Sequence, residues 1–428
     1  MTARLERVRR WLLLSVGFLL IGASTAVIAF AAGHAGNATP KPALGGKLPP
    51  RLPLSKGKTY FVDGAKGNDA ARGTAARPWR SLNVALRRVP ASGGQIVVRG
   101  GTYPGRYVFD RKVDPRNPVT LRAYSGERVV LTGGNPYEPA LWIVRARGLR
   151  VRGLEFSAPL ATSLRIENAS DIEIVGNEIH HSGNHGVLVA GTGTGDGVGN
   201  RNIQFWGNRI HDNGGREGGY NIIGNHGIYY GGTSSNDDGV DRRSVGGVIA
   251  NNVFYDQPYG RHLQIGSQVN GLIVTNNTFD NAYQEDTRAG KAIVIYAESN
   301  AFATSNVLVV NNLITHSRNY GVHGSSPQSL AANVVTNNLA FANAGNDFVN
   351  TWEQNVLYTL QEPNILGVDP RYVNRESKDF RLQAGSPALG RSLKAYTPPY
   401  DQRGLLRDPA TPDLGAFETR GASPVVSR

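Results

Sequence analysis

The 428-residue sequence predicts an all-β fold, a parallel β-helix in which short strands stack coil upon coil. Three observations support this class. A strand-like segment that ends in an asparagine recurs along the chain, a second alternating strand follows each recurrence, and no helical period separates the two. Repeats of this length bury their apolar face only by stacking on their neighbours, which is the architecture of a solenoid.

The recurring asparagine keeps the same place in every copy of the first strand. It is Asn208 in "IQFWGNRIHDNG" and Asn277 in "LIVTNNTFDN". The aligned set is Asn177, Asn208, Asn252, Asn277, Asn312 and Asn338, and the separations by subtraction are 31, 44, 25, 35 and 26 residues. This variation indicates a constant coil with insertions. Stacked asparagines can hydrogen-bond along the axis, so we expect a structural ladder rather than a catalytic set.

In the second strand of each coil, the outward residues differ in type from one coil to the next. It covers 185–190, 226–231, 261–266, 291–296 and 320–325 in successive coils. The inward residues should be Val187, Ile228, Leu263, Ile293 and Val322. The two-residue period of a strand then places Tyr230 in the core. It also predicts an outward set that contains Tyr229, His262, Gln264, Val294 and His323.

Composition divides the chain into five predicted regions. They are a signal peptide or signal-anchor (1–35), a linker (36–57), an N-terminal cap with the first coils (58–135), the β-helix repeats (136–360), and a C-terminal cap and tail (361–428). A helix over Pro78–Val89, with Trp79, Leu82 and Leu86 on one face, should shield the first coil. The tail has lost the repeat and should close the other end.

The N-terminus has the pattern of an export signal. Four arginines precede an apolar run from Trp11 to about Gly33. The run is about as long as the roughly 20 residues that a bilayer span needs, and small residues after Ala29 could support cleavage. In either case the basic flank places the rest of the chain outside the cytoplasm. We therefore expect a secreted or membrane-anchored protein, with membrane contact through this segment.

The charge of the chain favours an anionic partner, since the formal net charge is +13. The charge is spread out, and no basic arm, helix-turn-helix, zinc or RNA-recognition motif is visible, so nucleic-acid binding is not expected. Without cysteine the chain has no disulfide and no thiolate site. An acidic polysaccharide is the expected partner, and the protein is expected to be a monomer.

Three features together resemble a known superfamily. They are the opening Tyr60–Tyr103, the coils of the form "NN[TL][IF]", and the closing "SPALG...DLGAFE". Over roughly Lys58–Glu418 the chain resembles the bacterial right-handed parallel β-helix proteins of the pectate-lyase-like superfamily. The resemblance implies a right-handed coil. It does not select a reaction, because the superfamily includes polysaccharide lyases, glycoside hydrolases, uronate epimerases and proteins with no known activity.

Long insertions flank the second strand in neighbouring coils. Those before it cover 212–225 and 280–290, and those after it cover 190–201, 231–246 and 298–306. Loops are less constrained than stacked strands and are the usual place for function in a solenoid. Two walls of loops with a strand floor between them predict a groove for an extended polymer.

The floor of this groove should be basic and phenolic. The candidate catalytic residues are His226, Tyr229, Arg261 and Lys291. The candidate substrate-binding residues are His262, Gln264, Tyr296, His185, His323 and Arg288. In this assignment His226 or Tyr229 acts as base or acid, while Arg261 and Lys291 clamp a substrate carboxylate. A turn histidine and solvated edge cations are the competing structural explanations.

The residue types of the floor favour proton abstraction over hydrolysis. Typical glycoside hydrolysis needs two carboxylates about 5 to 9.5 Å apart, and the floor strands carry neither Asp nor Glu. Elimination from a uronate instead needs cations, a base and a proton donor. We therefore expect a polysaccharide lyase or a uronate C5-epimerase. A glycan-binding surface protein without activity, and a glycoside hydrolase that uses loop carboxylates, are the alternatives.

One acidic segment is a candidate cation site. Asp237, Asp238 and Asp241 in "NDDGVD" bring oxygen ligands close together, and the resemblance makes calcium the candidate ion because it is common in lyases of that superfamily. The segment lacks the twelve-residue EF-hand pattern. A solvated turn is the competing explanation.

Overall fold

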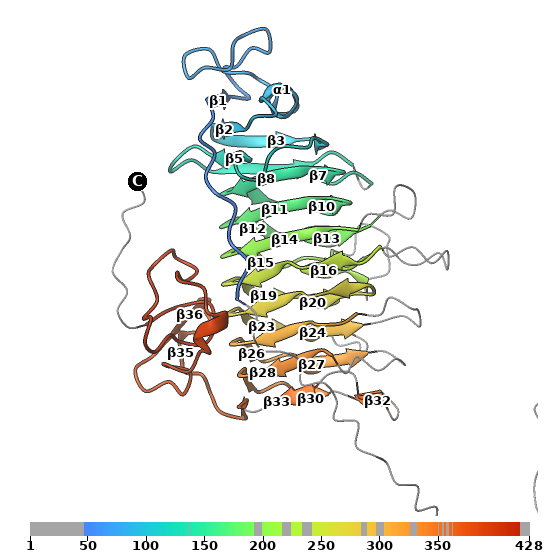
Figure 1. Ribbon diagram of the computed structural model, residues 1–428, viewed down its shortest axis with the longest axis vertical. Coiled ribbons are helices and arrows are strands. Elements are labelled where there is room, and N and C mark those ends of the chain that lie inside the picture. The colour runs from blue at the N-terminus through green and yellow to red at the C-terminus, as the bar shows by residue number, and fades with distance from the viewer. Residues whose placement is uncertain are drawn as a thin grey trace, which may run out of the picture. The chain divides into compact units, whose positions relative to one another are not determined.

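The computed structural model describes residues 47–419, with gaps at 136, 192–198, 216–223, 233–241, 284–288, 297–303, 326–331, 350, 353–354, 357–358 and 362. Its strands form three long parallel sheets, which we call A, B and C in the order in which each coil visits them. Strands of successive coils stack directly above one another (Figure 1). The predicted parallel β-helix is therefore confirmed.

Each complete coil contributes one strand to each sheet. Sheet A contains β1 (Thr59–Val62), β2 (Gly94–Val98), β5 (Val119–Ala123), β8 (Arg147–Arg152), β11 (Ser170–Val175), β14 (Arg201–Trp206), β18 (Val248–Ala250), β22 (Ile273–Thr275), β25 (Leu308–Val310), β28 (Val334–Thr336) and β33 (Thr359–Gln361), with β17 (Ser244–Val245) and β21 (Val269–Asn270) beside them. Sheet B contains β3 (Gly101–Pro104), β6 (Val129–Gly133), β9 (Glu155–Phe156), β12 (Glu178–His180), β15 (Arg209–His211), β19 (Val253–Gln257), β23 (Thr278–Ala282), β26 (Leu313–Thr315), β29 (Leu339–Phe341) and β34 (Ile365–Leu366). Sheet C contains β4 (Tyr107–Phe109), β7 (Leu141–Val144), β10 (Leu164–Glu167), β13 (Val187–Ala190), β16 (Ile228–Tyr230), β20 (Arg261–Ile265), β24 (Lys291–Tyr296), β27 (Tyr320–Ser325) and β30 (Asn346–Val349).

A full coil therefore has three strands, one more than the sequence pattern predicted. The segment read as one strand bends at its asparagine, so that β11 belongs to sheet A and β12 to sheet B. The residue before the asparagine takes a left-handed conformation, as in Gly176 (φ +58°) and Asn276 (φ +50°). Glycine and asparagine adopt this conformation more readily than other residues, which explains the recurring "GN" and "NN" pairs.

The asparagine ladder is confirmed. Asn252 is fully buried, and its Nδ2 donates to Asn277 Oδ1 at 3.0 Å and to the Phe205 carbonyl at 3.1 Å. Its own Oδ1 accepts the backbone N–H of Asn208 at 2.9 Å. The same side-chain bond joins Asn177 to Asn208 and Asn277 to Asn312. Each amide thus satisfies a turn whose backbone would otherwise be buried without partners.

Inward residues of the three sheets form one continuous core. Tyr230 belongs to it as predicted, with no exposed surface and a hydroxyl that donates to the Gly246 carbonyl at 3.0 Å. Within sheet B, the register partners Phe254 of β19 and Phe279 of β23 stack with ring centroids 4.6 Å apart. Burial of this kind, repeated in every coil, stabilises the fold without disulfides.

A short helix lies beside the first coils. Helix α1 (Leu82–Arg88) is shorter than the predicted Pro78–Val89, and Leu82, Ala85 and Leu86 are its buried residues. These side chains belong to the same core cluster as the strands of the solenoid. The role of this helix as a cap of the first coil remains a prediction.

The described N-terminal segment lies along the outer face of sheet A, seen as the blue trace in Figure 1. The Pro50 carbonyl accepts Gln204 Nε2 at 3.1 Å, and the Leu52 carbonyl accepts Arg150 Nη1 at 3.0 Å. The end of the predicted linker is thus packed against the solenoid. Among the described residues no helix is long and apolar enough to span a bilayer, and the predicted export segment, 1–35, lies outside them.

The C-terminal segment packs along the side of the solenoid, at the corner between sheets A and B (Figure 1). Its backbone carbonyls accept hydrogen bonds from the asparagines of four coils, Asn251, Asn276, Asn311 and Asn337. It includes the antiparallel pair β35 (Tyr372–Asn374) and β36 (Asp379–Leu382), and the 3-10 helix η3 (Lys394–Tyr396). A second antiparallel pair, β31 (Thr351–Trp352) and β32 (Asn355–Val356), precedes it. Closure of the last coil by the tail remains a prediction.

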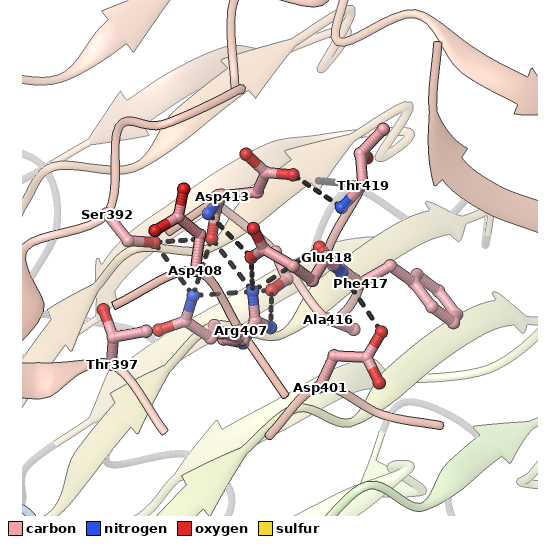
Figure 2. A network of polar contacts seen from close by, with 12 residues as sticks. Ser392, Thr397, Asp401, Arg407, Asp408, Asp413, Ala416, Phe417, Glu418 and Thr419 are labelled. Atoms are coloured by element: carbon pink, nitrogen blue, oxygen red, sulfur yellow. Dashed lines mark hydrogen bonds and ion pairs between the residues drawn. The ribbon is translucent and has the colours of Figure 1, made fainter. Parts of the chain in front are cut away.

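A buried polar network holds the end of this segment together (Figure 2). Arg407 and Glu418 form an ion pair at 3.2 Å, and their side chains are only 2% and 0% exposed. Arg407 Nη2 also donates to Asn251 Oδ1 at 2.9 Å, which ties the segment to the solenoid. A buried pair with this many hydrogen bonds fixes one geometry, because breaking it would leave a charge without compensation.

Candidate functional site

The groove floor predicted from the sequence is the outer face of sheet C. In the register of this sheet Ile228 lies between Val187 and Leu263, and Ile293 lies between Leu263 and Val322. These predicted inward residues are fully buried in the core. The strand assignment and the register of the floor are therefore confirmed.

Residues at the start of these strands form a column that we call the strand-start column. It consists of His185, His226, Arg261, Lys291 and Tyr320. Arg261 and Lys291 are register partners on neighbouring strands, which lie about 4.8 Å apart in a sheet. The two cationic residues are therefore neighbours in the sheet, and their common role in one site stays a prediction.

The two histidines of this column are part of the hydrogen bonding between coils. His185 Nδ1 accepts the backbone N–H of His226 at 3.1 Å, and His226 Nδ1 accepts the backbone N–H of Arg261 at 3.3 Å. A neutral ring whose Nδ1 accepts must carry its proton on Nε2. Both rings therefore present an N–H donor to their surroundings. This geometry suits hydrogen-bond donation and disfavours His226 as a base.

Burial keeps these rings neutral. It lowers the pKa of His185 to about 4. The pKa of His226 is well below its ordinary value, first because of burial and then because of the nearby Arg261 charge. Burial also lowers the pKa of Arg261, to about 10. At neutral pH the column thus combines neutral imidazoles with a charged guanidinium.

Lys291 lies in a pocket of aromatic and imidazole groups. It is 5% exposed, with Nζ 3.2 Å from His323 Nδ1 and 5.3 Å from the centroid of the Tyr320 ring. Burial, followed by the charges of Lys291 and Arg261, lowers the pKa of His323 to about 3. His323 is therefore neutral and accepts a hydrogen bond from the ammonium group, which fixes the position of the cation.

Tyr229 lies on the outer face, as predicted, and two glycines make room for its ring. A Cβ added to Gly266 would meet the Tyr229 hydroxyl oxygen at 2.4 Å, and one added to Gly231 would meet the ring at 2.6 Å. The ring lies 6.1 Å from that of His226 and 5.8 Å from that of His185. These glycines were not among the predicted site residues. The signal was present, since glycine follows the strand in both "YYG" and "QIG".

The predicted outward orientation of His262 is wrong. Its side chain has no exposed surface, lies 6.1 Å from the rings of both Phe254 and Phe279, and its Nε2 bonds to the Asp280 carbonyl at 3.0 Å. The chain turns from sheet B into sheet C here, so strand alternation does not extend through the corner. The residues that share this position in other coils are all small, Gly186, Gly227, Ala292 and Gly321. That pattern could have identified a narrow inward site.

The remaining predicted floor residues vary in exposure. Gln264 is 8% exposed and is the register partner of Tyr229 and Val294. Val294 is 1% exposed, whereas Tyr296 is half-buried at the end of its strand. The floor is therefore less open than an exposed groove. Four predicted site residues lie outside the described part of the chain: Arg288, Asp237, Asp238 and Asp241.

The described strands around Arg261 and Lys291 carry no carboxylate. The five strands β13, β16, β20, β24 and β27 have no Asp or Glu. One coil earlier, Glu167 of β10 is 1% exposed and accepts Trp142 Nε1 at 2.8 Å and Arg165 Nε at 2.7 Å. That carboxylate is already neutralised by its neighbours. The pair of free carboxylates that hydrolysis needs is not found among the described floor residues.

A second titratable cluster, which was not predicted from the sequence, lies on the outer face of sheet B. His180 Nε2 contacts Glu155 at 3.0 Å, and His211 contacts Glu178 at 3.2 Å and Asp212 at 2.8 Å. The two imidazole rings stack with centroids 5.1 Å apart. Among the described residues no group of His, Cys, Asp or Glu has the geometry of a metal site. The cluster is satisfied by its own ion pairs.

Comparison with known proteins decides the family. The family described as "Right handed beta helix region" matches residues 139–358, just over half of the chain. The chain belongs to the right-handed β-helix family. It is 24% identical over 443 residues to the uncharacterized protein YwoF of Bacillus subtilis (strain 168), an alignment that covers 77% of this chain and 92% of that protein.

Among solved structures, this β-helix protein is similar to the pectate lyase Pel9A. The TM-score is 0.59 at 14% sequence identity, and the match covers 85% of this chain and 97% of that structure. Similarity at this level of identity supports the pectate-lyase-like fold, as the sequence predicted. It does not assign a reaction.

Proposed function

We propose that this protein is an exported carbohydrate-active enzyme that binds an acidic polysaccharide across sheet C and removes the proton next to a uronate carboxylate. The observation that carries the proposal is the adjacent cation pair Arg261 and Lys291 on a floor whose described strands lack carboxylates. The likeness to a pectate lyase supports the choice of substrate class. The N-terminal pattern of arginines and an apolar run supports export.

In the proposed reaction the two cations neutralise the substrate carboxylate. This acidifies the C5–H bond, because the charge that develops on proton removal is stabilised by fixed donors. Tyr229 lies beside both histidines and, in its phenolate form, is the candidate for proton abstraction. The phenol that forms can then protonate the C4 oxygen, while the Nε2–H groups of His226 and His185 are candidate hydrogen-bond donors to the developing charge. Departure of the protonated C4 oxygen completes elimination and leaves a C4–C5 double bond, whereas return of a proton to C5 would give epimerisation.

The decisive experiment measures products on a panel of uronate polymers. Elimination should raise absorbance in the ultraviolet, because the product is an unsaturated uronate. The Arg261→Gln variant should lose at least about a hundredfold in rate, the usual cost of one transition-state donor. Arg116→Gln, at an exposed arginine far from the floor, is the matched control. Full activity in Arg261→Gln would contradict the assignment.

A glycan-binding protein without turnover is the second candidate. It is favoured by the hydrogen bonds of His185 and His226 to the backbone of the next coil, which leave neither imidazole as a free base. Binding of a uronate polymer without any new product would select it. New reducing ends without unsaturation would instead indicate a hydrolase that uses loop carboxylates. Loss of activity on chelation, restored by calcium, would support the predicted cation site at 237–241.

A further inference from the structure

A pocket lined by arginines lies on the outer face of sheet A, away from the proposed groove in sheet C. Its volume is about 460 Å³, and three parts of the chain line it: the N-terminal segment, sheet A, and residues 398–404 of the C-terminal segment. A pocket of this size is within the range of about 300 to 1,000 Å³ usual for small-molecule sites. It is much larger than a single inorganic anion needs.

The sheet side of this pocket contains more positive than negative charge. Glu173 is fully buried and forms ion pairs with Arg51 at 2.5 Å and with Arg150 at 2.9 Å. Two guanidinium groups thus share one carboxylate. Arg152 lies on the same face, two residues along β8, and is exposed. In the described part of the chain, the side chain of Arg152 has no hydrogen-bond or ion-pair partner.

Electrostatics support a deficit of negative charge at this face. Burial lowers the pKa of Arg150 to about 10, Glu173 opposes the shift, and the charges of Arg51 and Arg152 add to it. Like charges held close together are destabilising unless a counter-charge lies between them. An anion bound beside Arg152 would supply that counter-charge. Guanidinium groups also match the planar geometry of carboxylates.

The opposite wall is rigid and partly aromatic. Tyr400 is 40% exposed, and Pro398 and Pro399 lie next to it. Asp401, fully buried, accepts Arg403 Nε at 2.9 Å and the backbone N–H groups of Leu405 at 3.0 Å and Glu418 at 3.2 Å. Figure 2 shows Asp401 at the edge of the polar network that includes Glu418. The wall is therefore held in place before any ligand binds.

We propose that this pocket binds one uronate unit of an acidic glycan, with the carboxylate at Arg152 and the sugar ring against Tyr400. The guanidinium groups select the anion, and an exposed aromatic ring beside prolines offers an apolar surface to a pyranose. This site is separate from the proposed groove, and the proposal does not require that the groove be catalytic. A second site on the same body would raise the affinity for a polymer by increasing its effective concentration.

Isothermal titration with monomeric galacturonate and glucuronate tests the proposal, using the Arg261→Gln/Lys291→Gln variant so that the floor cations do not contribute. Uronate should bind this variant, and adding Arg152→Gln should weaken binding at least about tenfold, as expected for a charge-assisted hydrogen bond. Adding Arg116→Gln instead is the matched control and should change nothing. Unchanged binding on adding Arg152→Gln, or no uronate binding before it, would overturn the proposal.

Two further arms separate a sugar site from a simple anion site. Neutral galactose and inorganic sulfate are titrated into the same variant. Tyr400→Ala should weaken uronate binding several-fold and leave sulfate binding unchanged, because only the sugar contacts the ring. Sulfate binding without uronate binding would contradict a sugar site. Failure of the groove to give any product would not affect these results, since the floor cations are already removed.

Discussion

The asparagine ladder and the strand-start column are both built from residues at equivalent positions of successive coils. The ladder repeats one residue type, whereas the strand-start column does not. Asn177, Asn208, Asn252 and Asn277 repeat one residue, and each makes the same side-chain bond to the next coil. The strand-start column changes from His226 to Arg261 to Lys291 within the same sheet. A residue type that repeats in every coil points to a structural role, because every coil has the same backbone N–H and C=O groups that need hydrogen-bond partners. Residues that vary between otherwise equivalent coils point to a local role.

Part of the strand-start column has the same hydrogen-bonding role as the asparagine ladder. His185 and His226 accept a backbone N–H of the next coil, a task like that of the ladder asparagines. Arg261 and Lys291 contribute charge instead. Neutral imidazoles therefore give way to cations between His226 and Arg261. Substitutions can separate the structural part of each column from the chemical part.

The largest effect should come from breaking the ladder. Asn277→Ala removes two donors and an acceptor from a fully buried turn, including the bonds to Asn312 and to the Ile249 carbonyl. We expect the free energy of unfolding to fall by about 3 kcal/mol or more. Chemical denaturation measures it. Asn135→Ala, in an exposed turn, should cost far less, and equal losses would mean that the ladder is not structural.

Removing a floor cation should affect activity more than stability. Lys291→Gln eliminates the charge that His323 and Tyr320 position. We expect the rate of product formation to fall about 10²- to 10³-fold, with the melting temperature within a few degrees of wild type. Steady-state kinetics and thermal unfolding, measured in parallel, distinguish the two. A variant with a much lower melting temperature but an unchanged rate below that temperature would place Lys291 with the structural residues.

Acid should destabilise the protein through its buried histidines. Burial lowers the pKa of His262 to about 4, whereas an unfolded chain takes up this proton near pH 6.5. Stability is therefore retained above about pH 6.5 and lost as pH falls toward the folded pKa, by about 2 kcal/mol at pH 5 for this residue. His262→Ala should flatten the dependence of unfolding free energy on pH.

A methyl group at Gly266 should displace Tyr229 without unfolding the chain. The added Cβ would lie 2.4 Å from the Tyr229 hydroxyl oxygen, so the ring must move. We expect Gly266→Ala to lower activity about tenfold, as a small misplacement of a reacting group does. Gly224→Ala, whose Cβ would meet nothing within 4 Å, is the control. If both variants retain full activity, the position of Tyr229 is irrelevant to the reaction.

The smallest effect should come from the inward tyrosine. Tyr230→Phe removes one hydrogen bond, to the Gly246 carbonyl, and leaves the packing in place. The expected cost is about 1 kcal/mol of stability with unchanged glycan binding. Tyr229→Phe should show the reverse pattern. A loss of binding in Tyr230→Phe would show that the inward and outward sets are not functionally separate.

Repetition made much of the fold predictable from the sequence. The ladder, the inward set and the two orientations of Tyr229 and Tyr230 follow from periods that every coil repeats. The third strand was missed because a single left-handed residue, such as Asn276, bends the chain without interrupting its apolar pattern. His262 was misplaced because strand alternation does not continue through a corner. The pocket around Arg152 depends on segments distant in sequence, which no local pattern brings together.

The packing of residues 47–56 along sheet A has a mechanical consequence. A pull on the N-terminal end of this segment would first load its contacts with Gln204, Arg150 and Glu173, and only then the first strand, β1. These contacts would break one after another, so that only a few hydrogen bonds bear the load at any time. If the chain is tethered through its N-terminus, the segment would lengthen under tension and spare the stacked coils.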